Sequence, residues 1–162
     1  MTMLRPSCRI YSVGYEGATV EELVDRLARH GVQLLVDVRL QPWSRKPGFS
    51  KQPLSVALAM GGIEYVHEPL FGNPPENREA YRQGDPAAVD VIRQRVERKG
   101  QEALDKLVRE ALYRDVALLC VERESSRCHR RVITDLAQAR VLGLEVIDLD
   151  VATEPEPAYK PA

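Results

Sequence analysis

Short apolar runs alternate with amphipathic stretches along this chain. The run "RIYSVGY" (9–15) is β-branched and aromatic and closes at a glycine turn, which is typical of a buried strand. Thr19 and Glu22 then form a capping box, and apolar residues follow at i, i+3, i+4 and i+7 until Gly31. This pattern predicts a strand followed by an amphipathic helix.

The same alternation continues to the end of the chain. Further strands are predicted at "QLLVDVR" (33–39), "GIEYVH" (62–67), "DVALLCV" (115–121) and "LEVIDLD" (144–150). Helices are predicted at 54–60, from Pro86 to a break or bend at Gly100, along the stripe at 104–111, and from 132 to Gly143. The connection 68–84 is long and polar, which makes it a candidate lid or binding loop, and Pro74 and Pro75 argue against regular structure there.

Strands that alternate with helices indicate an α/β fold. Two of the strands are too apolar to have a wet face, so we predict a largely parallel sheet of about five strands with helices on both faces, a Rossmann-like or flavodoxin-like layering. A chain of 162 residues with 44% hydrophobic residues has enough apolar side chains for one core. We therefore predict a single domain at 1–150 and a flexible Pro- and Glu-rich tail at 151–162.

Composition and charge limit the cellular location and the binding partners that we expect. A net charge of −1 gives no global basic field, so anion recognition depends on local clusters at 39–51 and 127–131. The three cysteines cannot all pair, and the N-terminus lacks a signal-peptide pattern, so we expect a reducing cytoplasm. No apolar run approaches the roughly 20 residues of a membrane span, and we expect no membrane partner.

Ligands of parallel sheets bind at the carboxyl ends of the strands. Asp37 and Arg39 alternate with valines at such an end, so they share a face, where Asp37 could orient an arginine or form no more than a salt bridge. His67 follows the third strand and Glu122 the fourth. We expect these residues on one rim of the molecule.

The segment "SSRCHRR" (125–131) holds the candidate nucleophile. Ser125 or Ser126 could N-cap a helix whose first turn contains Cys128, where amides, helix dipole and arginines favour thiolate; Cys128 could equally be a buried apolar residue. Adjacent helical residues point about 100° apart, so His129 is a poor base for Cys128 and His67 is the better candidate.

The same segment is a candidate anion site. Helix-start amides together with Arg130 and its neighbouring arginines suit a phosphate or sulfate. Cys120, Cys128 and His129 could instead hold zinc, but their spacing contains no CxxC pair and no fourth ligand is evident, so we predict no metal site.

The loop "RLQPWSRKPGFSK" (39–51) interleaves aromatic and basic residues. Trp43 and Phe49, beside Arg39 and Arg45, suit stacking on a base while the phosphates are held. The competing interpretation is a loop pinned by two aromatics with solvated charges. No dinucleotide-binding or P-loop fingerprint is present, and no cofactor is identified.

Five motifs occur together and in order: "LLVDVR", "PWSRKPGFSK", "GIEYVH", "GNPPENR" and "CVERESSRCHRR". With them the chain resembles, over nearly all of residues 10–148, the prokaryotic family catalogued as domain of unknown function 488. The resemblance implies a compact α/β fold and a small intracellular prokaryotic protein. The shared positions have no assigned role in that family; they are Asp37, Arg39, Arg45, Phe49, Glu122, Cys128, His129 and Arg130.

Two hypotheses of different classes follow. The first is an enzyme acting on a phosphorylated or nucleotide-like substrate at the rim. Its candidate catalytic residues are Cys128, His67 and Asp37, and its candidate ligand-binding residues are Arg39, Trp43, Arg45, Phe49, Glu122, His129 and Arg130. The alternative is a noncatalytic module that binds nucleotide or nucleic acid. Turnover and thiol reactivity would separate them, whereas the sequence identifies neither the reaction nor the oligomeric state.

Overall fold

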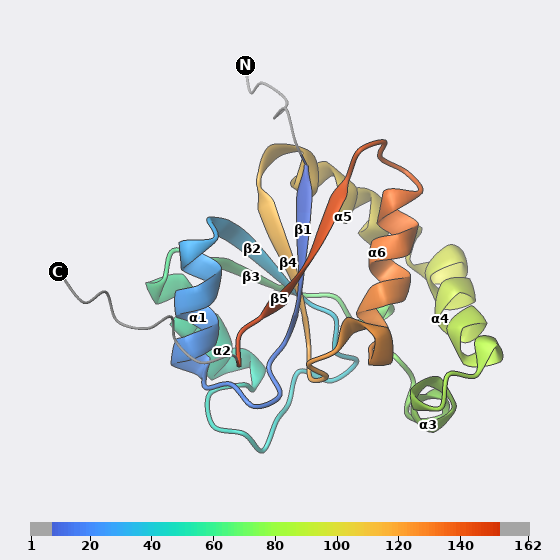
Figure 1. The fold of residues 1–162 in the computed structure, drawn as a ribbon, viewed down its shortest axis with the longest axis horizontal. Coiled ribbons are helices and arrows are strands. Elements are labelled where there is room, and N and C mark those ends of the chain that lie inside the picture. Colours follow the sequence, from blue (N-terminus) through green and yellow to red (C-terminus); the bar gives the residue numbers. More distant parts are fainter. Residues whose placement is uncertain (1–7, 153–162) are drawn as a thin grey trace, which may run out of the picture.

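Five parallel strands form one sheet in a computed structural model that describes residues 8–152 (Figure 1). The strand order is β3-β2-β4-β1-β5, and every neighbouring pair is parallel. The strands are β1 (Arg9–Gly14), β2 (Val32–Asp37), β3 (Glu64–His67), β4 (Asp115–Cys120) and β5 (Glu145–Asp150). The predicted parallel α/β sheet is confirmed.

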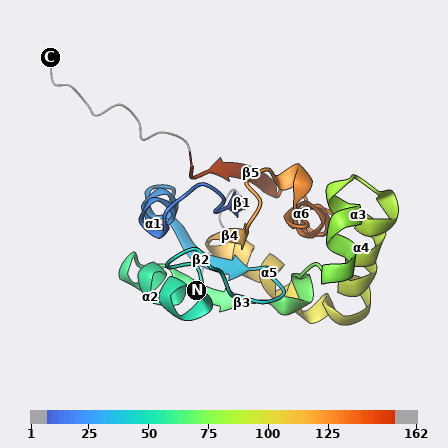
Figure 2. The same ribbon diagram turned by 90° about the horizontal axis from the view of Figure 1, so that it is seen from below.

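Helices cover both faces of the sheet, as predicted. The helices α1 (Val20–Arg29) and α2 (Lys51–Met60) gather on one side, and α4 (Pro86–Lys99) and α6 (Arg130–Gln138) lie on the other (Figure 2). One of the two bonds of the predicted capping box is present, because Thr19 Oγ1 accepts a hydrogen bond from the Glu22 N–H at 3.1 Å. This bond satisfies one of the free amides at the start of α1.

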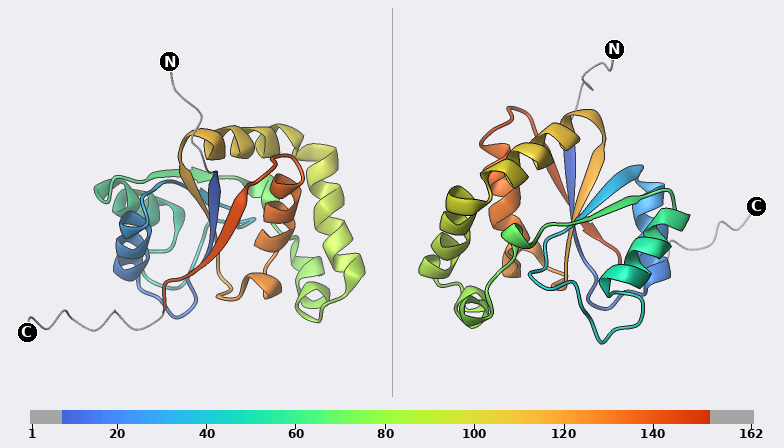
Figure 3. Two further views of the ribbon diagram at one scale, coloured as in Figure 1. Left: turned by 45° about the horizontal axis from the view of Figure 1, so that its top comes forward. Right: turned by 180° about the vertical axis from the view of Figure 1, so that it is seen from behind.

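The sheet separates two apolar cores. Successive side chains of a strand point to opposite faces, so in β4 the fully buried Leu118 joins the core under α4, α5 (Gln101–Tyr113) and α6, and the fully buried Leu119 joins the core under α1 and α2. Gly100 separates α4 from α5, which meet at a sharp corner (Figure 3). The predicted break at this glycine is confirmed.

The connection 68–84 contains more regular structure than its prolines suggest. It forms η1 (Pro69–Phe71), η2 (Pro75–Asn77) and the short helix α3 (Arg78–Arg82). Our expectation that Pro74 and Pro75 exclude regular structure was wrong at Pro75, which occupies the first position of η2, where a proline has no hydrogen bond to lose; Pro74 lies just before that helix.

The carboxyl end of the described chain is packed. Val151, which we assigned to the flexible tail, is buried in the core under α1 and α2, so the tail boundary was wrong at this residue. The rest of the predicted tail from residue 153 onward lies outside the described residues. Among residues 8–152, no helix has both the length and the apolar character that a membrane span requires.

Candidate functional site

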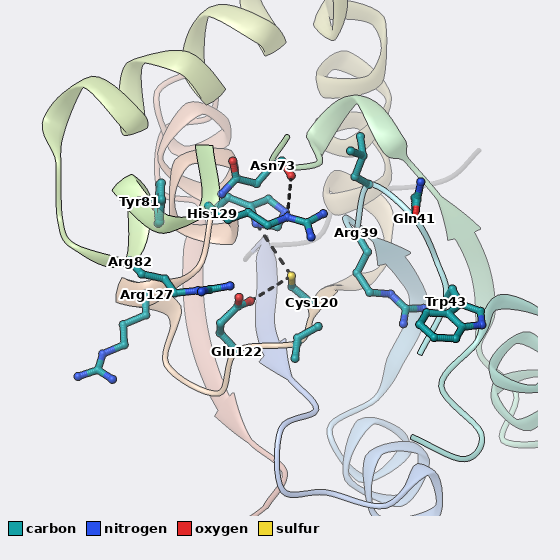
Figure 4. Close-up of a pocket in the computed structure, with 13 residues that line it drawn as sticks. Arg39, Gln41, Trp43, Asn73, Tyr81, Arg82, Cys120, Glu122, Arg127 and His129 are labelled. Carbon is teal, nitrogen blue, oxygen red and sulfur yellow. Dashed lines mark hydrogen bonds between the residues drawn. The ribbon is translucent and has the colours of Figure 1, made fainter. Parts of the chain in front are cut away.

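A pocket of about 420 Å³ opens at the carboxyl ends of β2 and β4 (Figure 4). The chain leaves β2 toward β3 at one edge of the sheet, and it leaves the neighbouring β4 toward β5 at the opposite edge. Two adjacent strands whose connections depart in opposite directions form a switch point, where α/β sheets bind ligands. The position of the pocket therefore follows from the strand order.

Three segments supply the polar lining. The segment after β2 contributes Arg39, Gln41 and Trp43; the connection before α4 contributes Asn73, Arg78, Tyr81 and Arg82; and β4 with the loop after it contributes Cys120, Glu122, Arg127 and His129. In Figure 4, Trp43 and Arg39 approach from one side, Arg82 and Arg127 from the other, and Cys120 and Glu122 lie between them.

Gly14 determines the path of the loop that carries Glu122. A Cβ at Gly14 would lie 1.7 Å from the Glu122 carbonyl oxygen, so only glycine lets this loop cross the end of β1. Arg130 holds the same carbonyl with Nη1 at 2.8 Å and donates to Ser12 Oγ with Nε at 2.8 Å. Arg130 is fully buried, so the structure places it beneath the loop and away from the pocket lining.

The start of α6 differs from our expectation. Ser125–Arg127 form the short helix η3, Cys128 is extended at φ −122° and ψ 143°, and α6 begins at Arg130 without a side-chain cap. The predicted serine cap, with Cys128 in the first turn, was therefore wrong. The Cys128 N–H instead bonds to the Ser125 carbonyl at 3.1 Å, which closes η3 before the chain can continue as a helix.

Two thiols and one imidazole meet at the wall of the pocket. His129 Nε2 lies 2.9 Å from the Val38 carbonyl oxygen, which can only accept, so Nε2 is the donor of this bond. Nδ1 lies 3.7 Å from Cys128 Sγ and 3.9 Å from Cys120 Sγ. The argument that separated His129 from Cys128 was wrong, because it assumed that both residues are helical.

Cys120 is the cysteine that lines the pocket, whereas Cys128 is 1% exposed and lies within the core. The neighbouring Cys128 thiol and burial raise the pKa of Cys120 well above its usual value, so the thiol is neutral. Cys120 Sγ donates to Glu122 Oε2 at 3.4 Å. Burial opposes the charge of Glu122, but its own backbone N–H, the Cys120 thiol and the nearby His129 lower its pKa. Glu122 is therefore an ionised carboxylate in the wall of the pocket.

Asp37 orients Arg39, as one of our two interpretations proposed. The guanidinium donates Nε to Asp37 Oδ1 at 2.9 Å and Nη2 to Asp37 Oδ2 at 2.6 Å. Burial works against the Arg39 charge, but the hydrogen bonds and charge of Asp37 raise its pKa. His67 Nε2 lies 2.7 Å from the Arg39 carbonyl and outside the pocket lining, so His67 braces the Arg39 backbone.

The two aromatics of the 39–51 loop have different environments. Trp43 is 66% exposed and lines the pocket, whereas Phe49 is fully buried and stacks on Tyr15 with ring centroids 4.3 Å apart. Phe49 also accepts a 2.7 Å bond from Arg39 Nη1 with its carbonyl oxygen. Trp43 thus fits the ligand-stacking interpretation and Phe49 the loop-pinning one. Arg45 is exposed and lies outside the pocket lining.

The sequence analysis proposed the 68–84 connection as a binding loop but did not identify its arginines as site residues. Arg78 and Arg82 come from α3, and Tyr81 secures this helix by donating to the Cys128 carbonyl at 3.1 Å. Burial and the nearby Cys128 raise the pKa of Tyr81 to about 12, so its hydroxyl remains a donor at neutral pH. The signal in the sequence was the candidate lid itself, whose "NREAYR" run carries two arginines and an aromatic residue.

The family model described as "Domain of unknown function DUF488" matches residues 19–137, and the chain belongs to this family. The matched region contains β2, β4, α3 and every polar residue that lines the pocket. No curated protein matches the chain.

Proposed function

We propose that this protein is an enzyme that acts on a phosphorylated, nucleotide-like small molecule in the pocket between β2 and β4. One observation carries the proposal: a single pocket joins three exposed arginines, an exposed tryptophan ring and an ionised glutamate. Its volume of about 420 Å³ falls within the usual range for small-molecule sites.

The arginines form the phosphate side of the proposed site. Arg82 and Arg127 make exposed ion pairs with glutamates three residues away on the chain, each at 3.4 Å. Such surface pairs contribute little free energy, so both guanidinium groups remain available to an anion. Arg78 donates Nε to the Asn73 carbonyl at 3.2 Å, which fixes its direction. Guanidinium groups bind phosphate oxygens in a bidentate manner.

Trp43 forms the base side of the site. A ring exposed to this extent has little to gain from packing, whereas an aromatic surface beside basic groups suits a heterocyclic base. Arg39 lines the same pocket and is held rigidly by Asp37. The base and the phosphate of one ligand would then bind at opposite sides of the pocket.

Glu122 is the proposed acid–base residue. Its carboxylate lies between the two sides of the pocket and is ionised at neutral pH, as a general base must be. Cys128 is buried, so we now assign it no direct contact with substrate, and Asp37 and His67 act as positioning residues for Arg39. We infer a cytoplasmic location, where Cys120 and Cys128 would stay reduced.

The alternative is a noncatalytic module that binds nucleotide or nucleic acid. The neutral Cys120 thiol favours this alternative, because it offers no nucleophile at the pocket wall. The arginines and Trp43 would serve binding equally well in both cases. Turnover of the bound ligand decides between them.

The test begins with a thermal-shift screen of nucleotides and phosphorylated metabolites, since a ligand that binds the native state raises the melting temperature. Calorimetry with the strongest nucleotide follows. Arg82→Ala should weaken its binding about tenfold or more. Trp43→Ala should weaken it by about 1–3 kcal/mol and leave binding of inorganic phosphate unchanged.

Arg98→Ala and Tyr113→Ala are the matched controls, because both residues are exposed and lie outside the pocket. Glu122→Gln should retain binding and lose turnover. Binding by the wild-type protein without turnover of any ligand supports the module instead of the enzyme. Unchanged affinity in both Arg82→Ala and Trp43→Ala would place the ligand outside this pocket and overturn the proposal.

A further inference from the structure

We propose that Cys120, Cys128 and His129 bind one thiophilic divalent cation, for which Zn²⁺ is the best match. The two sulfurs and one imidazole nitrogen lie within 4.8 Å of one another, and all three side chains are buried. They come from the end of β4, the extended residue after η3 and the residue before α6. Their spacing along the chain matches no metal-binding motif, and they come together only through η3 and the turn at Cys128.

The distances fit tetrahedral coordination. With Zn–S near 2.3 Å and Zn–N near 2.0–2.1 Å, a tetrahedral ion holds sulfur and nitrogen about 3.6 Å apart. His129 Nδ1 lies 3.7 Å from Cys128 Sγ and 3.9 Å from Cys120 Sγ. Both sulfur–nitrogen separations are within a few tenths of an ångström of this value. The two sulfurs lie within 4.8 Å of each other, against about 3.8 Å around a tetrahedral ion, so binding would bring them closer by up to about 1 Å.

The orientation of the His129 ring supports the same conclusion. Nε2 donates to the Val38 carbonyl, and the Val38 N–H is itself bonded to the Leu119 carbonyl at 3.0 Å. Metal-binding histidines are commonly oriented by such a bond from the second ring nitrogen to a backbone carbonyl. In His129, whose side chain is 5% exposed, this bond places Nδ1 beside the two thiols. Once Nδ1 carries no proton, it is oriented as a metal ligand between the two sulfurs.

The donor set selects the type of ion. Two sulfurs and an imidazole favour zinc and other soft or borderline cations, whereas Mg²⁺ and Ca²⁺ prefer oxygen ligands. Binding follows Zn²⁺ + 2 R–SH → Zn(SR)₂ + 2 H⁺, with both protons leaving to solvent. The two thiolates neutralise the cation, so the buried site acquires no net charge.

The fourth coordination position would face the pocket, beside Glu122. Glu122 Oε2 lies 3.4 Å from Cys120 Sγ, and Cys120, Glu122 and His129 all line the pocket. Three protein ligands with a fourth position open to a pocket is the arrangement of catalytic zinc sites, in which the metal activates a water molecule. This catalytic role rests on the proposed function, whereas binding of the cation does not.

The test uses the full chain, reduced and stripped of metal with a chelator, then titrated with Zn²⁺ by calorimetry in the absence of substrate. We expect one equivalent to bind, with metal content confirmed by mass spectrometry. Cys120→Ser, Cys128→Ser and His129→Ala should each lower the affinity about 100-fold or more, since each removes a direct ligand. Cys8→Ser and His30→Ala should bind as the wild type does, because both residues lie outside the cluster.

Cobalt provides a test that needs no variant. Co²⁺ bound to the wild-type protein should give thiolate-to-cobalt charge-transfer bands and the strong visible bands of a tetrahedral ion, unchanged by excess Mg²⁺. Absence of these bands, a failure to bind Zn²⁺, or Zn²⁺ binding that survives both Cys120→Ser and Cys128→Ser would overturn the proposal. All of these readouts are independent of nucleotide binding, so they stand whether or not the proposed enzyme activity is found.

Discussion

Asp37 and Arg39 form a buried ion pair beside the pocket, 0% and 5% exposed. Asp37 Oδ2 also accepts from the Tyr65 hydroxyl at 2.6 Å, and Arg39 Nη1 donates to the Tyr15 hydroxyl at 3.3 Å. Burial and the bond to Asp37 raise the pKa of Tyr65, which keeps this hydroxyl a donor. These bonds satisfy both charges away from water, where an unpaired charge would be costly.

Asp37→Asn should destabilise the protein by about 3–5 kcal/mol, because the side chain keeps its size while Arg39 loses its buried counter-charge. The free energy of unfolding in urea measures this change. Asp25→Asn is the control, since Asp25 pairs with Arg29 at 3.0 Å on the surface and is 59% exposed. The free energy of unfolding of Asp25→Asn should fall by no more than about 0.5 kcal/mol. Equal losses in the two variants would show that the buried pair has no special role.

The positions and partners of some of these residues could be predicted from the sequence, and those of others could not, for physical reasons. Asp37 and Arg39 were predictable as partners, because alternation along a strand is a local rule. Trp43 and Phe49 belong to one loop, and their opposite exposure depends on contacts such as the Tyr15 ring, which the loop sequence does not contain. Cys128 was misplaced because one extended residue interrupts what the sequence presents as a continuous helix start.

Among the elements, α3 is the one that contributes to the pocket without having been predicted from the sequence. It is only five residues long, too short to be stable alone, so its position depends on tertiary contacts. Asn77 Nδ2 donates to the Ala88 carbonyl at 2.9 Å, and Tyr81 donates to the Cys128 carbonyl. These two bonds connect α3 to α4 and to the loop before α6, and they hold Arg78 and Arg82 at the pocket.

Tyr81→Phe should lower the free energy of unfolding by about 1 kcal/mol, because the buried Cys128 carbonyl loses its donor while packing is retained. The amides of α3 should exchange hydrogen faster in this variant, since one of its two anchors is gone. Hydrogen exchange followed by mass spectrometry measures both the rate and its location. Tyr113→Phe, at an exposed position, serves as control and should leave exchange in α3 unchanged. Unaltered exchange in Tyr81→Phe would show that packing alone holds α3.

At the scale of the whole molecule, the sequence predicted the layers but not the strand order. Alternation of strands and helices is visible along the chain, so the parallel sheet with two covered faces could be predicted. The order β3-β2-β4-β1-β5 depends on where each crossover places the next strand, which local patterns do not encode. The pocket at the β2–β4 switch point therefore became evident only from the fold.

The two cores meet through the backbone of β4, whose Leu118 and Leu119 are fully buried on opposite faces. If the chain folds as one cooperative unit, damage to either core must destabilise both. Leu118→Ala and Leu119→Ala should each cost about 2–5 kcal/mol, and each should leave a single urea transition that coincides by far-UV and near-UV circular dichroism. Leu142→Ala, at a fully exposed position, should change stability by less than about 0.5 kcal/mol. Two separate transitions in either β4 variant would mean that the faces unfold independently, and the single-domain prediction would then be wrong.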